Sequence, residues 1–509
     1  MSQQPRAMSS STRAISPAAF GFDQARHLLW RAGFGGTPEQ VRLLASWGPE
    51  KAVDHLLNFK DIASYPWPTE DQFDGTIMRE PTEEERRQYR LAARAQDEDT
   101  LARIRLERQR REQADRTQVR EMQRWWLKRM IETPRPLEEK LTLFWHGHFA
   151  TGYRTIENSY HMFLQNQLFR SKAAGNFGEL LFAIVRDPAM LKYLDNDESR
   201  KGQPNENLAR ELMELFSLGV GNYAEKDIKD GARALTGFGI DGNVFAFRPE
   251  RHDDGPKTIL GRTGNLSGDD FVRAILEKRA CAEFITAKLY RYFVGDIPAG
   301  RTPEARAVEM VVKDLTSTLL GSKYELTPML KKMFLAEHFY DPSIMGQQIK
   351  SPVQLVVGAV RSLNAPVRDL GVLNDALGLM GQNLLHPPNV AGWSGGRTWI
   401  NTSTLYSRQN VLAFLLTGKL PRGRDPLADQ EPYDPMPLLS DLAASEPGAE
   451  RDPDRVIPYV QRMMLLTEGS TGYDDALREL VKAGGGRITA PVLTGMLTLI
   501  SAMPEYQLC

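Results

Sequence analysis

The residues from Thr82 to Thr133 constrain the fold more than any other part of the chain, because they include no proline and no glycine. Arginine, glutamate, glutamine and alanine dominate this stretch, and all four are good helix formers. We therefore expect one helix of roughly 50 residues, or two long ones, most of it charged. A solvated arm or hairpin explains this composition, and a partner-binding arm is the functional alternative. The mixed signs of its charges argue against a nucleic-acid clamp.

Helical periodicity runs through most of the remaining chain, and signals for strands are few. One alternating segment, 239–247, surrounds Asp241-Gly242-Asn243 and predicts a single β-hairpin. The predicted fold class is therefore mainly α. We expect a large multi-helix single core, a long charged helical arm at about 80–130, and at most one small β-hairpin.

The order of the segments predicts where the domains begin and end. Residues 1–20 are rich in Ser, Gln and Ala, and we expect them to be disordered. Residues 21–415 are expected to form one helical domain that includes the charged arm. A polar, Pro-rich segment at 416–433 is predicted to be a linker, and 434–509 is predicted to be a small helical tail.

The charges of the chain nearly cancel, with 64 Lys and Arg against 65 Asp and Glu and a formal net charge of −1. This balance gives no electrostatic argument for binding nucleic acid or an anionic membrane. No run of about 18 apolar residues occurs, so we expect no transmembrane segment. Residues 1–19 lack the apolar core of a signal peptide, so the sequence as it stands predicts a cytoplasmic protein. The two cysteines, Cys281 and Cys509, rule out a disulfide framework.

The segment from Asn205 to Glu214 places two amides, three carboxylates and one guanidinium on a predicted helix. With about 100° between successive residues, Asn207, Glu211 and Glu214 fall on one stripe, and Arg210 lies at its edge. The opposite stripe is apolar, so this side of the helix is buried. The polar side is then either an ordinary solvated surface or one wall of a site.

Surface ion pairs explain part of this acidic helix. Glu206 with Arg210 and Arg210 with Glu214 are i, i+4 pairs, each of which contributes about 0.2–0.5 kcal/mol. That explanation gives Asn207 and Glu211 no role, so we favour a buried polar network here.

Two histidine motifs supply further candidates. His146-Gly147-His148 closes an apolar helix; on a continuing helix the two imidazoles would point about 200° apart, whereas a break at Gly147 would place them on one face. Alternatively, one histidine caps the helix and the other packs against Trp145. His252-Asp253 fits a metal ligand or an acid–base pair, but the turn-forming Asp-Asp-Gly-Pro composition explains it equally well.

Motifs of several common catalytic and binding classes are absent from the sequence. It has no Gly-x-Ser-x-Gly, no phosphate-binding loop and no Gly-x-Gly-x-x-Gly. Neither cysteine has a neighbouring base in the sequence. We therefore expect neither a nucleophilic triad nor a nucleotide site.

Several blocks of sequence, taken together and in order, are specific enough to indicate a family. They are Ala25–Gly35, Leu137–Phe149, Asn205–Gly219, Ala232–Phe238, His252-Asp253, Lys257–Gly261 and Pro387–Trp393. In these blocks the chain resembles the DUF1800 family, a large bacterial group known only as a domain of unknown function. The resemblance covers roughly residues 22–415, and 417–509 lies outside its clearest part. It implies a mainly helical protein and brings no established activity or cofactor.

The resemblance also carries expectations about export and partners. Members of the family are often exported and often encoded beside DUF1501 proteins, which are similar to sulfatases and alkaline phosphatases. This implies a DUF1501-like protein as a partner. The chain departs from the family in showing no export signal and in having Phe216 where members often have His. The loss of that His weakens any ligand set that requires it.

The leading hypothesis is a metal-dependent enzyme, either a hydrolase or an oxidoreductase, with the two histidine motifs and the acidic helix as three walls of one site. The expected metal ligands are His146, His148, Glu211 and His252, the expected catalytic groups are Glu206, Arg210 and Asp253, and Asn205, Asn207 and Glu214 complete the polar site. The mixture of imidazole and carboxylate suggests Zn, Fe or Mn.

The rival hypothesis is a non-catalytic helical scaffold. The same polar residues would then form a buried network that fixes how the helices pack, and the charged arm would recruit a partner.

Overall fold

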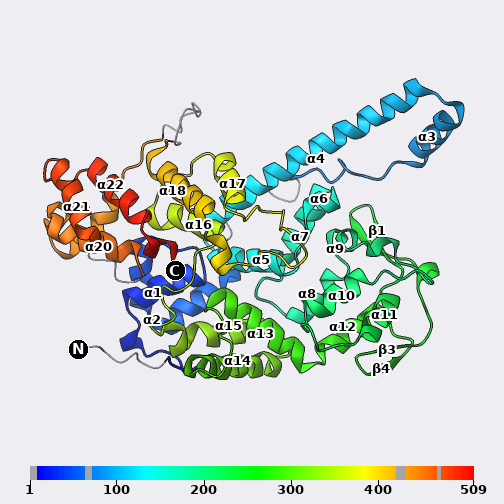
Figure 1. Ribbon diagram of the computed structural model, residues 1–509, viewed down its shortest axis with the longest axis horizontal. Helices are drawn as coiled ribbons and strands as arrows, with labels where there is room; N and C mark the ends of the chain where they lie inside the picture. Colours follow the sequence, from blue (N-terminus) through cyan, green and yellow to red (C-terminus); the bar gives the residue numbers. More distant parts are fainter. Residues whose placement is uncertain (1–7, 64–71, 420–430, 467–471) are drawn as a thin grey trace.

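The computed structural model describes residues 8–63, 72–419, 431–466 and 472–509, and in these residues helices α1–α22 accompany four short strands (Figure 1). The prediction of a mainly α fold is confirmed. No helix in these residues combines the length and the apolar character needed to cross a membrane. Two predictions fall partly outside the described residues: disorder at 1–7 and the linker at 420–430.

The larger buried apolar cluster joins helices from the first two thirds of the chain. Its core includes Leu28, Phe169 and Leu315, which are completely buried. The helices that contribute to it are α1 (Phe22–Arg31), α2 (Pro38–Leu57), α5 (Pro136–His148), α7 (Ser159–Ser171), α8 (Phe177–Ile184), α9 (Pro188–Tyr193), α10 (Asn207–Glu214), α11 (Glu225–Ala234), α12 (Gly268–Leu276), α13 (Arg279–Phe293), α14 (Pro303–Gly321) and α15 (Leu326–Leu335).

A second apolar cluster lies beneath the helices of the C-terminal part, at the upper left of Figure 1. The inner half of α4 packs into it through Val119, Met122 and Trp126, and the short α6 contributes Tyr153. The helices concerned are α4 (Glu98–Glu132), α6 (Tyr153–Ile156), α16 (Pro352–Leu363), α17 (Leu370–Leu379), α18 (Thr402–Thr417), α19 (Ser440–Ser445), α20 (Pro453–Met464), α21 (Gly472–Ala483) and α22 (Ala490–Ser501).

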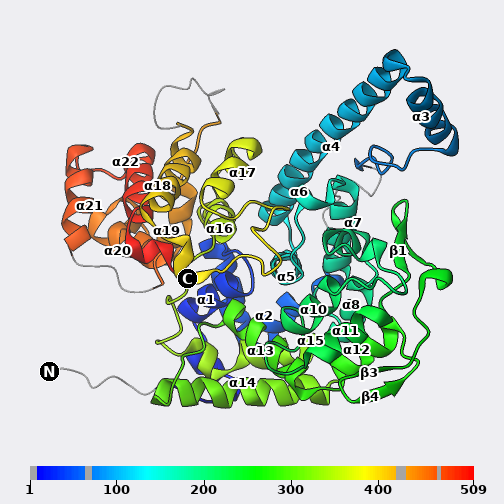
Figure 2. The ribbon, with the colours of Figure 1, turned by 45° about the vertical axis from the view of Figure 1, so that its right-hand side comes forward.

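The charged stretch forms two helices, α3 (Glu83–Ala95) and α4, and not one uninterrupted helix. Thr82 and Glu85 form a capping box at the start of α3. Gln96 adopts a left-handed conformation with φ 53°, and the Asp97 side chain then accepts a hydrogen bond from the Thr100 amide to begin α4. In both ribbon views the outer half of α4 extends away from the body and carries α3 at its far end (Figures 1 and 2).

Residues 9–20 are held against the core, although the sequence led us to expect disorder there. The Ile15 amide donates to the Leu335 carbonyl (2.8 Å) and the Glu337 amide donates to the Arg13 carbonyl (2.8 Å). Ile15 and Phe20 are buried. Two buried side chains and several backbone hydrogen bonds therefore fix a segment that has no helical periodicity.

Two small antiparallel hairpins are the only sheets in the described residues. The predicted one consists of β1 (Phe238–Asp241) and β2 (Val244–Phe247). The second, β3 (Lys257–Ile259) and β4 (Arg262–Gly264), has no counterpart in the sequence analysis. Its strands have three residues each, which is too short for an alternating pattern to be recognised.

The C-terminal segment returns to the centre of the fold. Lys350 donates its Nζ proton to the Tyr506 carbonyl (2.6 Å) and lies between the rings of Trp30 and Tyr506, 4.0 and 3.9 Å from their centroids. The backbones of Gln348 and Cys509 also exchange hydrogen bonds. The tail therefore packs on the helical domain.

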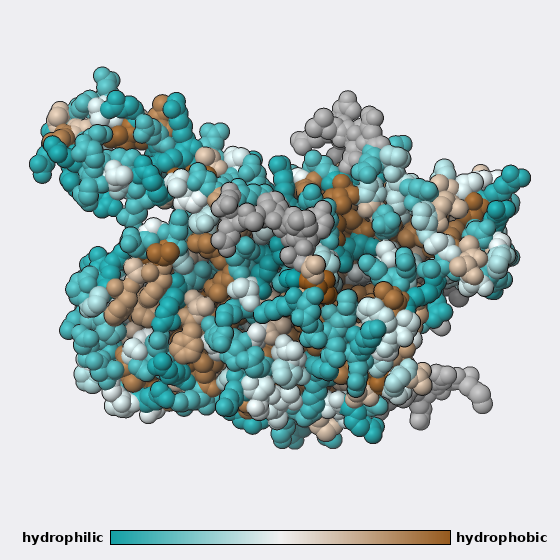
Figure 3. Space-filling model, turned by 180° about the vertical axis from the view of Figure 1, so that it is seen from behind, coloured by the Kyte–Doolittle hydropathy of each residue, from teal (hydrophilic) through white to brown (hydrophobic). Residues whose placement is uncertain are grey.

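The surface is mostly polar on the face seen from behind, where apolar side chains gather in several separate patches (Figure 3). Among the large apolar side chains that are exposed in the described residues are Val220, Leu379 and, on the α3–α4 hairpin, Tyr89, Leu91 and Leu106.

Candidate functional site

Helix α5 continues through Gly147 to His148, so the break that would have placed both imidazoles on one face does not occur. Gly147 instead lies where the loop after His386 packs on α5. The loop residue Gly392 lies against its carbonyl oxygen, and the Trp393 ring would be 3.5 Å from a Cβ at position 147. The two histidines therefore point to different sides of the helix.

His146 is buried between two indole rings. Its ring centroid lies 5.4 Å from that of Trp126 and 5.5 Å from that of Trp393. Burial, with a smaller contribution from His386, lowers the pKa of His146 to about 3. Its Nε2 atom has no hydrogen-bond partner in the described residues. His146 is therefore a neutral, buried imidazole at physiological pH.

His148 occupies a separate aromatic pocket. Its Nε2–H donates to the Phe216 carbonyl (3.0 Å), and its ring stacks on Phe144 and meets the edge of Trp145. Burial, followed by the positive charge of Lys288, lowers the pKa of His148 to about 3. This residue therefore agrees with the alternative expectation, that one histidine packs against Trp145.

The expected metal-ligand set of His146, His148, Glu211 and His252 is not assembled. Among the residues that the structure describes, no three His, Cys, Asp or Glu side chains are placed to hold one metal ion. The contact between the histidine turn and the acidic segment runs through the Phe216 carbonyl and not through a carboxylate. The physical reason is the continuous α5 helix, which separates the two imidazoles.

The acidic helix α10 uses most of its polar groups in local contacts. Arg210 pairs with Glu206 (3.0 Å) and with Glu225 of α11 (3.1 Å). The Tyr223 hydroxyl donates to Glu214 (2.6 Å). Asn205 accepts a hydrogen bond from the Asn207 amide and donates to the Asp195 carbonyl, so it fixes the entry to the helix. These contacts favour the explanation of the acidic helix by surface ion pairs over a catalytic arrangement.

Glu211 is the one carboxylate of α10 that fits neither explanation completely. It is half-buried, and burial, together with the charge of Glu214, raises its pKa. Its charge in turn adds to burial in raising the pKa of Tyr193. The Tyr193 ring would lie 3.7 Å from a Cβ on Gly152, at the entry to α6.

The His252-Asp253 motif belongs to a tight turn. The Nδ1–H of His252 donates to the Thr236 carbonyl (2.8 Å), and Asp253 accepts two hydrogen bonds from Arg233. The Arg233 guanidinium is the main reason that the pKa of Asp253 falls to about 2. Asp253 also accepts from the Gly255 amide (2.8 Å), as expected for the turn. These contacts favour the structural reading of the motif.

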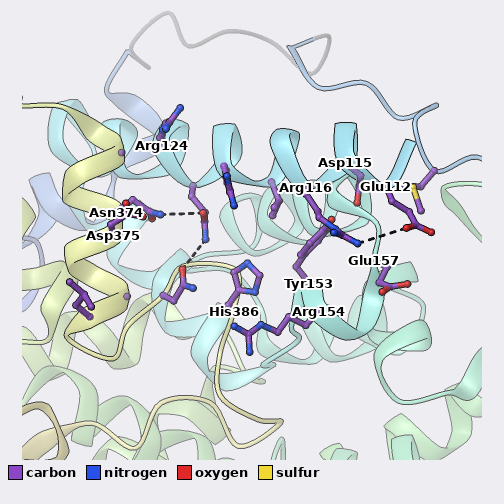
Figure 4. Close-up of a pocket in the computed structure, with 18 residues that line it drawn as sticks. Glu112, Asp115, Arg116, Arg124, Tyr153, Arg154, Glu157, Asn374, Asp375 and His386 are labelled. Atoms are coloured by element: carbon purple, nitrogen blue, oxygen red, sulfur yellow. Dashed lines mark hydrogen bonds and ion pairs between the residues drawn. The ribbon is translucent and has the colours of Figure 1, made fainter. Parts of the chain in front are cut away.

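A different site lies between α4, α6, α17 and the loop at 383–386. These elements line an open groove of about 950 Å³ (Figure 4). The lining residues are Met78, Glu112, Asp115, Arg116, Val119, Arg120, Gln123, Arg124, Tyr153, Arg154, Glu157, Gly371, Asn374, Asp375, Gly378, Leu379, Asn383 and His386. A volume of this size is typical of a small-molecule site.

Arginines of α4 form one wall of this groove. Arg116, Arg120 and Arg124 are four residues apart and therefore share one face of the helix, and Arg154 of α6 joins them. Arg116 approaches Glu112 at 3.8 Å. Neither Arg120 nor Arg124 nor Arg154 forms an ion pair with any described residue. The groove thus contains three arginines that have no carboxylate oxygen within 4 Å among the described residues, although carboxylates also line the groove.

Asp115 and Tyr153 form a buried pair at one end of the groove. The Asp115 carboxylate accepts hydrogen bonds from the Ser159 amide (3.0 Å) and hydroxyl (2.6 Å). Burial and the neighbouring Asp115 carboxylate raise the pKa of Tyr153, so its phenol stays protonated at neutral pH. The Tyr153 amide donates to the Leu385 carbonyl (3.1 Å), which ties α6 to the loop that carries His386.

His386 lies next to this pair, with its ring meeting the edge of Tyr153 at a centroid distance of 5.6 Å. Burial, and after it the charge of Arg154, lowers the pKa of His386 to about 4. Figure 4 shows His386 and Arg154 between the carboxylates Asp375 and Glu157, which lie toward opposite ends of the groove. The middle of the groove therefore has positive charge and uncharged hydrogen-bonding groups.

The sequence contained a signal for this groove. Arginines at positions 116, 120 and 124 share a helical face, and the apolar stripe that includes Val119, Met122 and Trp126 shows where α4 enters the core. The opposite wall comes from α17 and the loop after it, far away in the sequence. No local pattern could have brought these segments together.

Nearly the whole chain matches one protein family. A family model described as "Protein of unknown function (DUF1800)" covers residues 27–508. The chain belongs to the DUF1800 family. Neither a curated protein nor a solved structure matches it.

The DUF1800 match extends beyond the blocks that carried the resemblance, since it includes the C-terminal tail. Two of those blocks meet beside the groove in this DUF1800 chain. The loop from Pro387 to Trp393 leaves the groove at His386 and packs on the end of α5, where Gly392 meets Gly147 and Trp393 meets His146. This contact holds one wall of the groove to the helical core.

Proposed function

We propose that the protein binds an anionic ligand in the groove between α4 and α17, and that this groove is its working site. The observation that carries the proposal is that Arg120, Arg124 and Arg154 line one hollow without an ion pair among the described residues. Guanidinium groups bind carboxylate, phosphate and sulfate through paired hydrogen bonds. An anion in the groove would supply the partner that these cations lack.

The spacing of the cations suits a small or short ligand. Positions four apart on α4 differ by about 6 Å along the helix axis, so neighbouring arginines can hold one anionic group or two successive ones. The carboxylates Glu157 and Asp375 lie toward opposite ends (Figure 4) and leave the middle to Arg154 and His386. An anion would therefore be attracted to the middle.

The uncharged groups support the same proposal. Tyr153 and His386 are neutral at physiological pH, because burial raises the pKa of the first and lowers that of the second. Neutral side chains beside Arg154 can hydrogen-bond a ligand without weakening the attraction between that arginine and an anion. If the groove supports a reaction, these are the groups positioned to hold or move a proton.

Binding of inorganic phosphate and of sulfate, measured by isothermal titration calorimetry, tests the proposal. Arg120→Gln is expected to weaken binding about tenfold, because one charge-assisted pair is lost. Arg110→Gln is the matched control, since Arg110 is exposed on the same helix and outside the groove. Absence of binding to the wild type, or equal weakening by both variants, would overturn the proposal.

A metal-dependent hydrolase or oxidoreductase built on His146, His148 and Glu211 has less support, because these side chains do not form a ligand cluster in the described residues. Elemental analysis of tag-free protein tests that reading directly. If the protein contains about one equivalent of Zn, Fe or Mn and His146→Ala does not, the result would support the metal-dependent enzyme.

A second candidate function is a scaffold that recruits a DUF1501-like protein. The α3–α4 hairpin favours it, because Tyr89, Leu91 and Leu106 expose about half of their surface on an element that projects from the body (Figure 2). Co-expression with a DUF1501-like protein should give a complex on size-exclusion chromatography that Leu91→Glu disrupts. Val220→Glu, at an exposed apolar site elsewhere, should leave it intact.

A further inference from the structure

A chain of amides links α4 to the wall of the groove opposite the arginines. Gln123 donates to Asn383 (2.9 Å) and to the Leu384 carbonyl (2.6 Å), and Asn374 donates to Gln123 (3.2 Å). Figure 4 shows this chain of hydrogen bonds between α4, α17 and the loop after α17. The chain fixes the orientation of each amide, so it determines which atoms remain for a ligand.

Three polar atoms in the lining are buried without a hydrogen-bond partner among the described residues: Asp115 Oδ2, Asn374 Oδ1 and His386 Nδ1. Asn374 is 8% exposed, and its Oδ1 atom is buried without a hydrogen bond, because its Nδ2 group is the one that binds Gln123. The Nδ1 atom of His386 is likewise buried without a partner. Leaving a buried acceptor unsatisfied costs about 1–3 kcal/mol. The Asn374 and Asp115 oxygens therefore require a hydrogen-bond donor that the described residues do not supply, and His386 Nδ1 requires a donor or an acceptor according to its tautomer.

The surface of α17 in the groove includes two glycines, and the Arg124 guanidinium lies against the first of them, Gly371. Gly371, Asn374, Asp375 and Gly378 follow the i, i+3, i+4, i+7 pattern of one helical face. The nearest atom to a Cβ at Gly378 would be 3.9 Å away, on Asn383, so space is free above this turn. A flat ligand can lie against α17 there and reach both Asn374 and the exposed carboxylate of Asp375.

We propose that the ligand is a hydroxyl-bearing anion, specifically a sugar that carries a phosphate, sulfate or carboxylate group. The anionic group binds Arg120 and Arg154, and the sugar hydroxyls donate to Asn374 and Asp375 and form a hydrogen bond with His386. This inference rests on the proposed function, because it uses the same groove and the same arginines.

The chemistry of the lining distinguishes such a ligand from a bare anion. Sulfate offers no donor for the Asn374 Oδ1 atom and inorganic phosphate offers only the P–OH groups of its protonated forms, whereas a sugar has several hydroxyls, each of which both donates and accepts. The carboxylates of Asp375 and Glu157 would repel a uniformly charged polyanion, but they can accept hydrogen bonds from hydroxyl groups. A groove of about 950 Å³ has room for a ring in addition to its anionic substituent.

Calorimetric titration of the full chain with paired probes tests this inference. The pairs are glucose 6-phosphate with inorganic phosphate, glucose 6-sulfate with sulfate, and glucuronate with acetate. We expect at least one sugar to bind ten times more tightly than its ring-free partner, and glucose alone to bind more weakly than that sugar. The pair with the largest difference identifies the anionic group.

Two variants assign the effect to the α17 wall. Asn374→Leu should reduce the preference for the sugar while leaving affinity for the ring-free anion unchanged, whereas Arg120→Gln should weaken both. Asp375→Ala, at an exposed position, repeats the test should Asn374→Leu fail to fold, as judged by circular dichroism.

The outcomes separate the two proposals. Ring-free anions that bind as tightly as every sugar, in a manner sensitive to Arg120→Gln, would refute the sugar inference and leave the proposed function standing. Absence of binding by all probes would overturn both. A sugar preference that neither Asn374→Leu nor Asp375→Ala reduces would overturn the inference as stated.

Discussion

Gly392 packs so closely on Gly147 that a β-carbon on Gly392 would overlap the Gly147 carbonyl oxygen. Gly392 also has φ +76°, a conformation that other residues rarely adopt. The contact fastens the loop after His386 to the end of α5. The close approach requires that residue 392 has no side chain.

Gly392→Ala is therefore expected to lower the free energy of unfolding by about 2–4 kcal/mol, through the steric overlap and the strained backbone. Urea denaturation followed by circular dichroism measures the change. Gly396→Ala is the matched control, because Gly396 also has positive φ but would have no neighbour within 4 Å of a Cβ. Its cost should be about 1 kcal/mol, from the backbone alone. If both variants lower the free energy of unfolding equally, the contact between Gly392 and Gly147 does not contribute to stability.

Glu139→Gln is expected to destabilise the fold by about 3–5 kcal/mol, because it removes the carboxylate that neutralises buried arginines. Glu139 is completely buried and accepts hydrogen bonds from Arg129, Arg170 (2.7 Å) and the Trp126 indole (3.0 Å). Thermal unfolding checks the prediction. Glu83→Gln breaks an exposed pair with Arg86 and should change stability by less than about 0.5 kcal/mol. Similar losses in both variants would contradict this account.

The buried carboxyl of Asp187 should make the free energy of unfolding decrease as the pH rises. Burial raises the pKa of its carboxyl from 3.8 to about 7, although it caps α9 and accepts a hydrogen bond from Gln165 (2.8 Å). The folded state therefore resists ionisation that the unfolded chain undergoes freely. The associated stability is present below pH 4 and is lost between about pH 4 and pH 7.

Asp187→Asn isolates this effect from the other titrating groups, because asparagine keeps the cap but cannot ionise. As the pH rises from 4 to 8, the free energy of unfolding of the variant should increase by about 2–4 kcal/mol relative to that of the wild type. Guanidinium unfolding at several pH values measures the difference. If the difference in unfolding free energy between the variant and the wild type does not change with pH, the Asp187 carboxyl has the same pKa in the folded and unfolded states.

The fold could be predicted from sequence further than the site could. Helical periodicity and capping residues are local, so a mainly α fold and the charged helices near Thr82 follow from short windows. The break at Gln96 did not follow, because neither proline nor glycine marks it. The histidine site was expected from a local rule about Gly147, but the helix continues through this residue, and the loop that packs there, through Gly392, is distant in the sequence. Sites assembled from separate segments depend on packing that no single window contains.

The charge of Arg154 can be measured through its neighbour His386. After burial, Arg154 is the group that lowers the pKa of His386, which is about 4. Arg154→Gln removes that charge and should raise the pKa toward its ordinary value of about 6.5, while burial keeps it below that value. Titration of the imidazole Cε1–H signal by NMR detects the shift.

The same signal reports on the groove ligand, because an anion held by Arg154 would offset its charge. Saturating inorganic phosphate should therefore raise the pKa of His386 in the wild type and have a smaller effect in Arg154→Gln. Arg110→Gln, outside the groove, should behave as the wild type does. A His386 pKa that responds neither to Arg154→Gln nor to phosphate would separate this imidazole from the charges of the groove and remove it from the proposed site.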